Sequence, residues 1–175
     1  LRADSQAARR LQEVRGLYAE SAVAVRRPTE EDVQALAELM YRFYSLNEEF
    51  DPLWATAPNL RELVAEEAKE LVTSQSDLVL VAVRDSKVVG YVRASVERNR
   101  LLKHGSVLNI KELYVRPEER RLGVATMLVE RIIDEARKAG LKYVSVEFPS
   151  ANVIAQEMYA KIGFRPYLVR YLREV

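Results

Sequence analysis

The 175-residue chain has no cysteine, and histidine occurs once, as His104. Without cysteine there is no disulfide, no thiol nucleophile and no thiolate metal site. One histidine excludes a histidine-rich metal centre and disfavours a Ser-His-Asp triad. We expect no metal site, so any chemistry must use carboxylates, hydroxyls, backbone amides or a bound cofactor.

Long apolar runs are also missing, and the charged start of the sequence lacks a signal-peptide core. The 27 basic and 26 acidic side chains give a formal net charge of +1. This balance argues against a nucleic-acid coat or a polybasic membrane anchor. We therefore expect a cytoplasmic protein that binds neither nucleic acid nor a membrane.

Hydrophobic periodicity predicts a helical extension at residues 1–20 and one mixed α/β domain at 21–175. Strands are predicted at 22–27, 79–83, 88–95, 106–115, 142–147 and 164–173, and helices at 30–45, 60–73, 122–139 and 152–162. The consecutive strands predict an antiparallel stretch. The later strand-helix-strand unit predicts two parallel neighbours joined by a right-handed crossover.

The most informative segment is Leu113–Ala125, which is typical of a strand, a basic turn and the start of a helix. A helix N-terminus binds anions through its free N–H groups and its dipole, and Gly123 leaves room for a phosphate to approach. Arg120 and Arg121 are unfavourable there unless an anion compensates. The segment predicts phosphate binding; the alternative is an incidental glycine beside solvated arginines. The glycine motifs of Rossmann and P-loop nucleotide enzymes are absent.

Two motifs resemble those of the GNAT superfamily, which comprises acetyl-CoA-dependent N-acetyltransferases. The first is Arg120-x-x-Gly123-x-Ala125, similar to the acetyl-CoA signature. The second is Asn152-x-x-Ala155-x-x-x-Tyr159-x-Lys161-x-Gly163-Phe164, similar to a later family motif. The resemblance covers roughly residues 22–170. It implies a mostly antiparallel central sheet with a parallel β-α-β unit, and a splayed strand pair that forms the slot for acyl-CoA.

The resemblance also implies acetyl-CoA as the cofactor, with CoA as the product. The amides of Arg121–Thr126 would hold the pyrophosphate, and the backbone of Leu113–Val115 would pair with the pantetheine arm. Asn152 matches a position that often contacts this arm, and it can also cap a helix. The predicted cofactor-binding residues are Leu113, Tyr114, Val115, Arg120, Arg121, Leu122, Gly123, Val124, Ala125, Thr126 and Asn152.

Acetyl transfer requires a proton for the departing thiolate and stabilisation of the carbonyl oxygen. Tyr159 matches the family tyrosine near the sulfur, and a phenol with a pKa near 10 can donate that proton. The alternative is that Tyr159 is a core side chain. The N–H of Leu113 or Val115 would stabilise the oxygen.

The acceptor amine must be neutral to attack, and Glu112 is the candidate base. A carboxylate alternating with Leu108 and Ile110 is costly to bury unless it faces a site. The alternative is a locally open sheet in which Glu112 pairs with an arginine or lysine. A kinked strand would exchange the facing of Lys111 and Glu112.

The loop Leu46–Asn59 resembles the acceptor-binding loop of the family. It contains Glu48, Glu49, Phe50, Asp51 and Trp54, of which the acids attract a cationic amine and the rings can hold it. The alternative is a solvated loop whose rings plug the core.

We expect direct acetyl transfer in a ternary complex to a small amine, a polyamine, or a peptide N-terminus or lysine. The alternatives are a non-catalytic acyl-CoA sensor and a protein-interaction domain. A homodimer is compatible with the resemblance.

Overall fold

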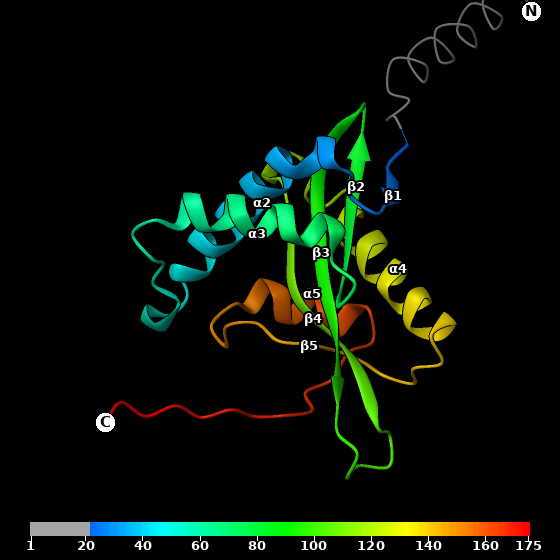
Figure 1. Ribbon diagram of the computed structural model, residues 1–175. Helices are drawn as coiled ribbons and strands as arrows, with labels where there is room; N and C mark the ends of the chain where they lie inside the picture. Colours follow the sequence, from blue (N-terminus) through cyan, green and yellow to red (C-terminus); the bar gives the residue numbers. More distant parts are fainter. Residues whose placement is uncertain (1–21) are drawn as a thin grey trace, which may run out of the picture.

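The computed structural model describes residues 22–175, so the extension predicted at 1–20 lies outside the described residues. Five strands form one sheet in the order β1-β2-β3-β4-β5 (Figure 1). The strands are β1 (Ala24–Arg26), β2 (Asp77–Arg84), β3 (Lys87–Arg98), β4 (Ser106–Val115) and β5 (Val144–Val146). The first four are antiparallel and β5 joins β4 in parallel. The predicted mixed sheet is confirmed.

Helices cover both faces of this sheet. They are α2 (Val33–Glu48), α3 (Leu60–Thr73), α4 (Val124–Lys138) and α5 (Val153–Lys161), with 3-10 turns at η1 (Glu30–Asp32), η2 (Pro52–Trp54) and η3 (Pro117–Glu119). Helices α2 and α3 lie on one side of the sheet, and α4 lies on the other (Figure 1). Within residues 22–175, none of the helices combines the length and apolar composition needed to cross a membrane.

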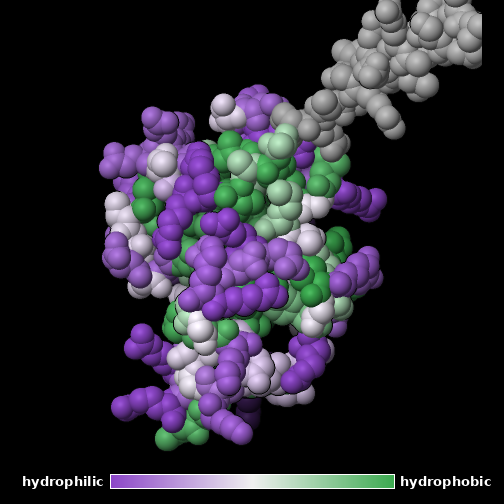
Figure 2. All heavy atoms as spheres, turned by 90° about the vertical axis from the view of Figure 1, so that its right-hand side faces the viewer, coloured by the Kyte–Doolittle hydropathy of each residue, from purple (hydrophilic) through white to green (hydrophobic). Residues whose placement is uncertain are grey.

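Each face of the sheet has its own apolar core. In α2, Leu39 and Met40 follow Leu36 by three and four residues, and all three pack against β2, β3 and α3. Leu128 and Ile132 of α4 fill the opposite core together with Tyr159 of α5. The outer face of α4 carries ion pairs between neighbouring turns, and hydrophilic side chains cover much of that side of the molecule (Figure 2).

The prediction of a sixth strand at 164–173 is wrong. Residues 164–175 form no strand, and the side chains of Tyr167, Leu168 and Leu172 are largely exposed. A strand needs a neighbouring backbone to accept and donate its hydrogen bonds. None of the described residues pairs with this segment, and Pro166 removes one of its donors.

A bulge in β4 sets the direction of Glu112. In the register of β3 and β4, Arg93 faces Glu112 and Ala94 faces Ile110, so Lys111 has no partner. One extra residue reverses the alternation of side chains. Glu112 therefore points to the α2–α3 face, whereas Ile110 belongs to the α4 core. The predicted alternation of Glu112 with Leu108 and Ile110 is wrong, and the alternative of a kinked strand is confirmed.

The two parallel strands separate soon after they meet. β5 pairs with β4 only at Leu108–Ile110, and β4 continues for five more residues to Val115. Within the described residues 22–175, no strand therefore pairs with residues 111–115 on the β5 side. This confirms the splayed pair expected from the resemblance.

Candidate functional site

The unpaired edge of β4 presents backbone groups to the gap beside β5. The N–H of Arg116 donates to the carbonyl of Val89 at 2.9 Å, so the backbone N–H of Arg116 points toward β3. Antiparallel ladders alternate between bonded and non-bonded residues. The N–H groups of Leu113 and Val115 consequently point away from β3 into the gap, as the prediction for these two residues requires.

The start of α4 lies just beyond the end of β4. Arg121 has a φ of 63° and Gly123 a φ of 80°, so the turn approaches the helix through two left-handed residues. No hydrogen bond among residues 22–175 uses the backbone N–H groups of Arg121 through Thr126. Such a run of free amides at a helix N-terminus forms a concave anion-binding site.

The side chains at this turn leave the amides accessible. Arg120 donates from Nε to the carbonyl of Val115 at 3.1 Å, and its guanidinium lies over the ring of Tyr114. Arg121, Leu122 and Gly123 are exposed, and a side chain at Gly123 would meet no atom within 4 Å. The residues present thus fit a phosphate-bearing cofactor.

Asn152 caps α5, because its Oδ1 accepts a hydrogen bond from the N–H of Ala155 at 3.0 Å. Its side-chain NH₂ makes no hydrogen bond within the described part of the chain. The capping role of Asn152 is confirmed. Its side-chain NH₂ is free to contact the cofactor arm, and this contact stays a prediction.

Tyr159 is a core side chain of the α4 face, with 4% of its surface exposed. Its ring stacks on Phe148 at 5.5 Å between centroids and meets Phe164 edge-on at 5.3 Å. Burial raises the pKa of the phenol above its ordinary value, so the group stays protonated at neutral pH. The core alternative is therefore confirmed, and it is compatible with a proton-donating role.

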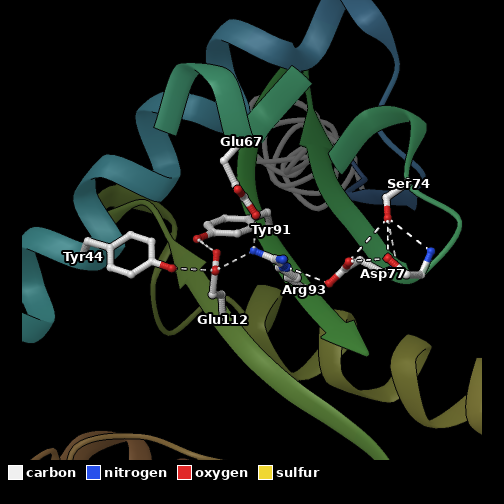
Figure 3. A network of polar contacts seen from close by, with 8 residues as sticks. Tyr44, Glu67, Ser74, Asp77, Tyr91, Arg93 and Glu112 are labelled. Carbon is white, nitrogen blue, oxygen red and sulfur yellow. Dashed lines mark hydrogen bonds and ion pairs between the residues drawn. The ribbon is translucent and has the colours of Figure 1, made fainter. Parts of the chain in front are cut away.

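Glu112 is buried on the opposite face, and three donors, one from α2 and two from β3, hold it (Figure 3). The phenol of Tyr44 in α2 donates to Oε1 at 2.9 Å, and that of Tyr91 in β3 donates to Oε2 at 2.8 Å. Arg93 Nη1 lies 3.3 Å from Oε1. The alternative in which Glu112 pairs with an arginine is thus confirmed. The base role remains a prediction.

Arg93 joins three carboxylates (Figure 3). Besides Glu112, it contacts Glu67 of α3 and Asp77 of β2, each at 2.8 Å. Burial opposes the charged form of Arg93, but these carboxylates outweigh it and raise the pKa of the guanidinium. Arg93 therefore remains a cation and cannot exchange a proton with Glu112.

Burial also acts on the two phenols. Burial first, and then the negative charge of Glu112, raises the pKa of Tyr44 and the pKa of Tyr91. Both tyrosines are therefore hydrogen-bond donors to a carboxylate at neutral pH.

A cavity of about 570 Å³ opens between α2, η2 and α3, next to this network. Its lining residues are Met40, Tyr44, Leu53, Trp54, Ala55, Thr56, Ala57, Leu60, Leu63, Val64, Glu66, Glu67 and Glu70. Three glutamates and no basic residue line it, so it favours a cationic guest. Tyr44 and Glu67 connect this cavity to Glu112.

Of the acidic and aromatic residues singled out in the predicted acceptor loop, only Trp54 lines the cavity, although smaller residues of the same loop line it as well. Glu48 accepts a hydrogen bond from the hydroxyl of Thr56 at 3.1 Å. Asp51 caps η2 through the N–H of Leu53 at 2.9 Å. Glu48 and Asp51 therefore serve the structure of the loop itself, and the cavity draws its carboxylates from α3 instead.

Sequence reasoning missed Tyr44, Tyr91, Arg93 and the glutamates of α3. Arg93 carried a usable signal, because it is a charge within the otherwise apolar predicted strand 88–95. The glutamates of α3 have the pattern of an ordinary solvated helix face. The tyrosines had no signal, since their importance comes only from their contact with Glu112.

Comparisons with known proteins agree with this geometry. The model of the acetyltransferase (GNAT) family matches residues 33–164. A probable N-acetyltransferase, camello of Xenopus tropicalis, is 28% identical over 137 residues, which are 78% of this chain and 60% of that protein. The chain thus spans less than two thirds of this relative.

Solved structures share the fold at low sequence identity. The BH1408 protein of Bacillus halodurans, a tetramutant, gives a TM-score of 0.77 at 18% identity, covering 87% of this chain and 99% of that one. AAC(6')-Iy, bound to the bisubstrate analogue CoA-S-monomethyl-acetylneamine, gives a TM-score of 0.71 at 17% identity. The match covers 89% of this chain and 99% of that one.

Proposed function

The chain belongs to the acetyltransferase (GNAT) family, and we propose that it transfers the acetyl group of acetyl-CoA to a primary amine. One observation carries this proposal. The free amides at the start of α4 adjoin the open edge of β4, and the buried carboxylate of Glu112 on this strand connects to an acidic cavity. An anionic and a cationic substrate thus have separate sites beside one strand.

For acetyl-CoA, the amides of Arg121–Thr126 would hold the pyrophosphate, and Arg121 would add positive charge. The exposed N–H groups of Leu113 and Val115 would bind the pantetheine arm or the thioester oxygen. Bound acetyl-CoA supplies the activated acetyl group. The end-to-end similarity in fold to AAC(6')-Iy, which was solved with a CoA-containing analogue, supports this arrangement.

For the acceptor, the cavity between α2 and α3 would take a cationic amine. The side-chain carboxylates of Glu66 and Glu70 make no hydrogen bond or ion pair within residues 22–175, whereas that of Glu67 is bound to Arg93. Two carboxylates one helical turn apart are therefore available to hold a second ammonium. The acetylneamine part of the analogue bound by AAC(6')-Iy supports an amine acceptor. We infer that a diamine or polyamine is preferred over a monoamine.

Glu112 and Tyr159 would divide the proton transfers between the two faces of the sheet. Glu112 takes a proton from the acceptor ammonium, and the neutral nitrogen then bonds to the acetyl carbon as the carbon–sulfur bond breaks. Tyr159, which burial keeps protonated, would protonate the departing sulfur and would regain a proton as the acylated nitrogen loses its second one. A backbone N–H of β4 stabilises the negative charge on the carbonyl oxygen.

Calorimetric titration with CoA tests the first half of the proposal. Wild-type protein should bind CoA, and Arg121→Glu should weaken this binding about tenfold or more. Arg100→Glu makes the same charge change at another exposed position and should leave the binding unchanged. A folded wild-type sample that does not bind CoA overturns the proposal.

Release of free CoA thiol from acetyl-CoA tests the second half. The chain has no cysteine, so a thiol reagent has no background from the protein. Acetylation should be faster with 1,4-diaminobutane than with butylamine, and Glu66→Gln combined with Glu70→Gln should remove this preference. CoA binding without acetylation of any amine would instead favour the acyl-CoA sensor.

A further inference from the structure

Glu112 does not reach the acceptor cavity. It is 4% exposed, and it is absent from the residues that line the cavity, whereas Tyr44 is among them. A base must lie within hydrogen-bonding reach of the proton it removes, directly or through one intermediary. The separation between Glu112 and the cavity therefore requires such an intermediary.

We propose that Tyr44 relays the proton of the acceptor ammonium to Glu112, so that the phenol and the carboxylate act together as the base. The inference rests on the proposed function and adds a residue that touches the acceptor. Tyr44 lies at the wall of the cavity and donates to Oε1 of Glu112 at 2.9 Å. Tyr44 thus links the cavity wall to the carboxylate, toward which its phenol oxygen points (Figure 3).

The other two donors to Glu112 cannot serve as this relay. Tyr91 is completely buried and does not line the cavity. Arg93 remains a cation beside three carboxylates. Both hold Glu112 in place, and among the described residues that contact it Tyr44 alone also lines the cavity.

The transfer is balanced within three groups. The ammonium gives one proton to the phenol oxygen of Tyr44 as the phenol gives its own proton to Oε1 of Glu112. The amine is then neutral, Tyr44 is again a phenol and Glu112 is a carboxylic acid. No free phenolate is needed, which agrees with a phenol whose proton burial holds tightly. Glu112 returns its proton to solvent by the reverse path after the acetylated product leaves.

The ring of Tyr44 is positioned for this role by its neighbours. Phe43 meets it edge-on at 5.2 Å, and Phe43 itself meets Trp54 edge-on at 6.5 Å. Tyr44→Phe keeps this aromatic packing and removes only the oxygen. The variant therefore isolates the relay from the fold.

The test is the rate of thiol release by wild type and Tyr44→Phe between pH 6.5 and 9.5, with 1,4-diaminobutane and glycinamide as acceptors. The relay predicts a kcat that is about 10 to 100 times lower at pH 7 with the diamine. The loss should shrink below about fivefold with glycinamide at pH 9, where its α-amine, with a pKa near 8, is already neutral. The KM for acetyl-CoA should not change.

Two variants control the assignment. Tyr91→Phe removes the 2.8 Å bond to the other oxygen of Glu112, and it should lower the rate equally for both acceptors at every pH. Glu67→Gln tests whether this carboxylate, which lines the cavity, is the base instead. The relay predicts that Glu67→Gln retains the wild-type pH profile.

The outcomes separate the two proposals. Wild-type kcat in Tyr44→Phe, or a loss that is the same at every pH and for both acceptors, overturns the relay and leaves the acetyltransferase intact. Loss of the pH dependence in Glu67→Gln also overturns the relay. A wild-type protein that binds CoA and acetylates no amine overturns the proposed function and the relay with it.

Discussion

Arg93 and Glu112 face each other across β3 and β4, with Nη1 of the guanidinium 3.3 Å from Oε1 of the carboxylate. They meet at the bulge, where the extra residue Lys111 turns Glu112 toward α2. The same guanidinium holds Glu67 of α3 and Asp77 of β2. One cation therefore ties the candidate base to the helix that lines the acceptor cavity.

Removal of Arg93 should destabilise the protein strongly. In Arg93→Met, Glu112 and Asp77 lose their cation while Glu112 stays buried, and breaking one partner of such a pair costs about 3–5 kcal/mol. Urea unfolding measures the change in the free energy of unfolding. Adding Glu112→Gln to Arg93→Met should recover part of the loss, because the buried charge is gone. Wild-type stability of Arg93→Met would contradict the network.

Glu112→Gln should lower kcat by about 100-fold or more, because an amide cannot take a proton and general-base catalysis contributes about 10²–10⁴. The amide retains the size of the carboxylate and an oxygen for the phenol of Tyr44. The dissociation constant of CoA, measured by calorimetry, should stay within about twofold of wild type. A kcat near the wild-type value would exclude Glu112 as the base.

Arg121→Gly should separate stability from CoA binding. Arg121 has a φ of 63°, which costs a side-chain-bearing residue about 1–2 kcal/mol relative to the right-handed region. Glycine relieves this strain, although its greater freedom in the unfolded chain offsets part of the gain. We expect an unchanged or higher melting temperature together with weaker CoA binding. Arg121→Asn, which also tolerates a positive φ, should behave in the same way. A lower melting temperature in both would refute this prediction.

Gly90→Ala should destabilise the sheet where β3 approaches β4 and α4. An added Cβ would lie 3.0 Å from the carbonyl oxygen of Tyr114 and 3.1 Å from Cγ2 of Val115. Overpacking of this kind costs about 1–3 kcal/mol. Thermal unfolding measures the effect, and an unchanged melting temperature would show that the strands separate at no cost.

The free energy of unfolding should fall in acid, because Asp32 stabilises the fold only as a carboxylate. The hydrogen bond from Arg26 is the largest influence on this carboxyl; it outweighs the effect of burial and, with the bonds from Thr29, lowers the pKa. A lowered folded pKa adds stability that is fully present above the unfolded value of about 3.9 and is lost as the pH falls through the folded value.

Asp32→Asn should therefore cost about 1–3 kcal/mol at pH 7, and the difference from wild type should shrink below pH 4. Urea unfolding at pH 7, 4 and 2.5 provides the measurement. Glu30→Gln, at an exposed position two residues earlier, should show no such pH dependence. An equal cost of Asp32→Asn at all three pH values would point to packing instead of charge.

Local pattern was enough for most of the fold. The bounds of α3 and β4 agree with the predicted helix at 60–73 and strand at 106–115. Apolar spacing and turn residues are properties of neighbouring positions, and they act before distant parts of the chain meet. The candidate anion site is also local, because a glycine, small residues and free amides lie within one turn. By contrast, the strand predicted at 164–173 needed a pairing partner, and local pattern does not supply one.

The sequence by itself determined the strand, turn and helix that form the candidate anion site, and the absence of cysteine excluded a thiol nucleophile from this chain. Only the tertiary structure decided the surroundings of Glu112. Side chains of a strand alternate between the two faces of the sheet in either register, so the alternation alone does not say which face Glu112 takes. The bulged residue Lys111 places Glu112 on the α2–α3 face. Tyr44 lies 68 positions from Glu112 along the chain, and their contact exists because α2 packs on the sheet at that point.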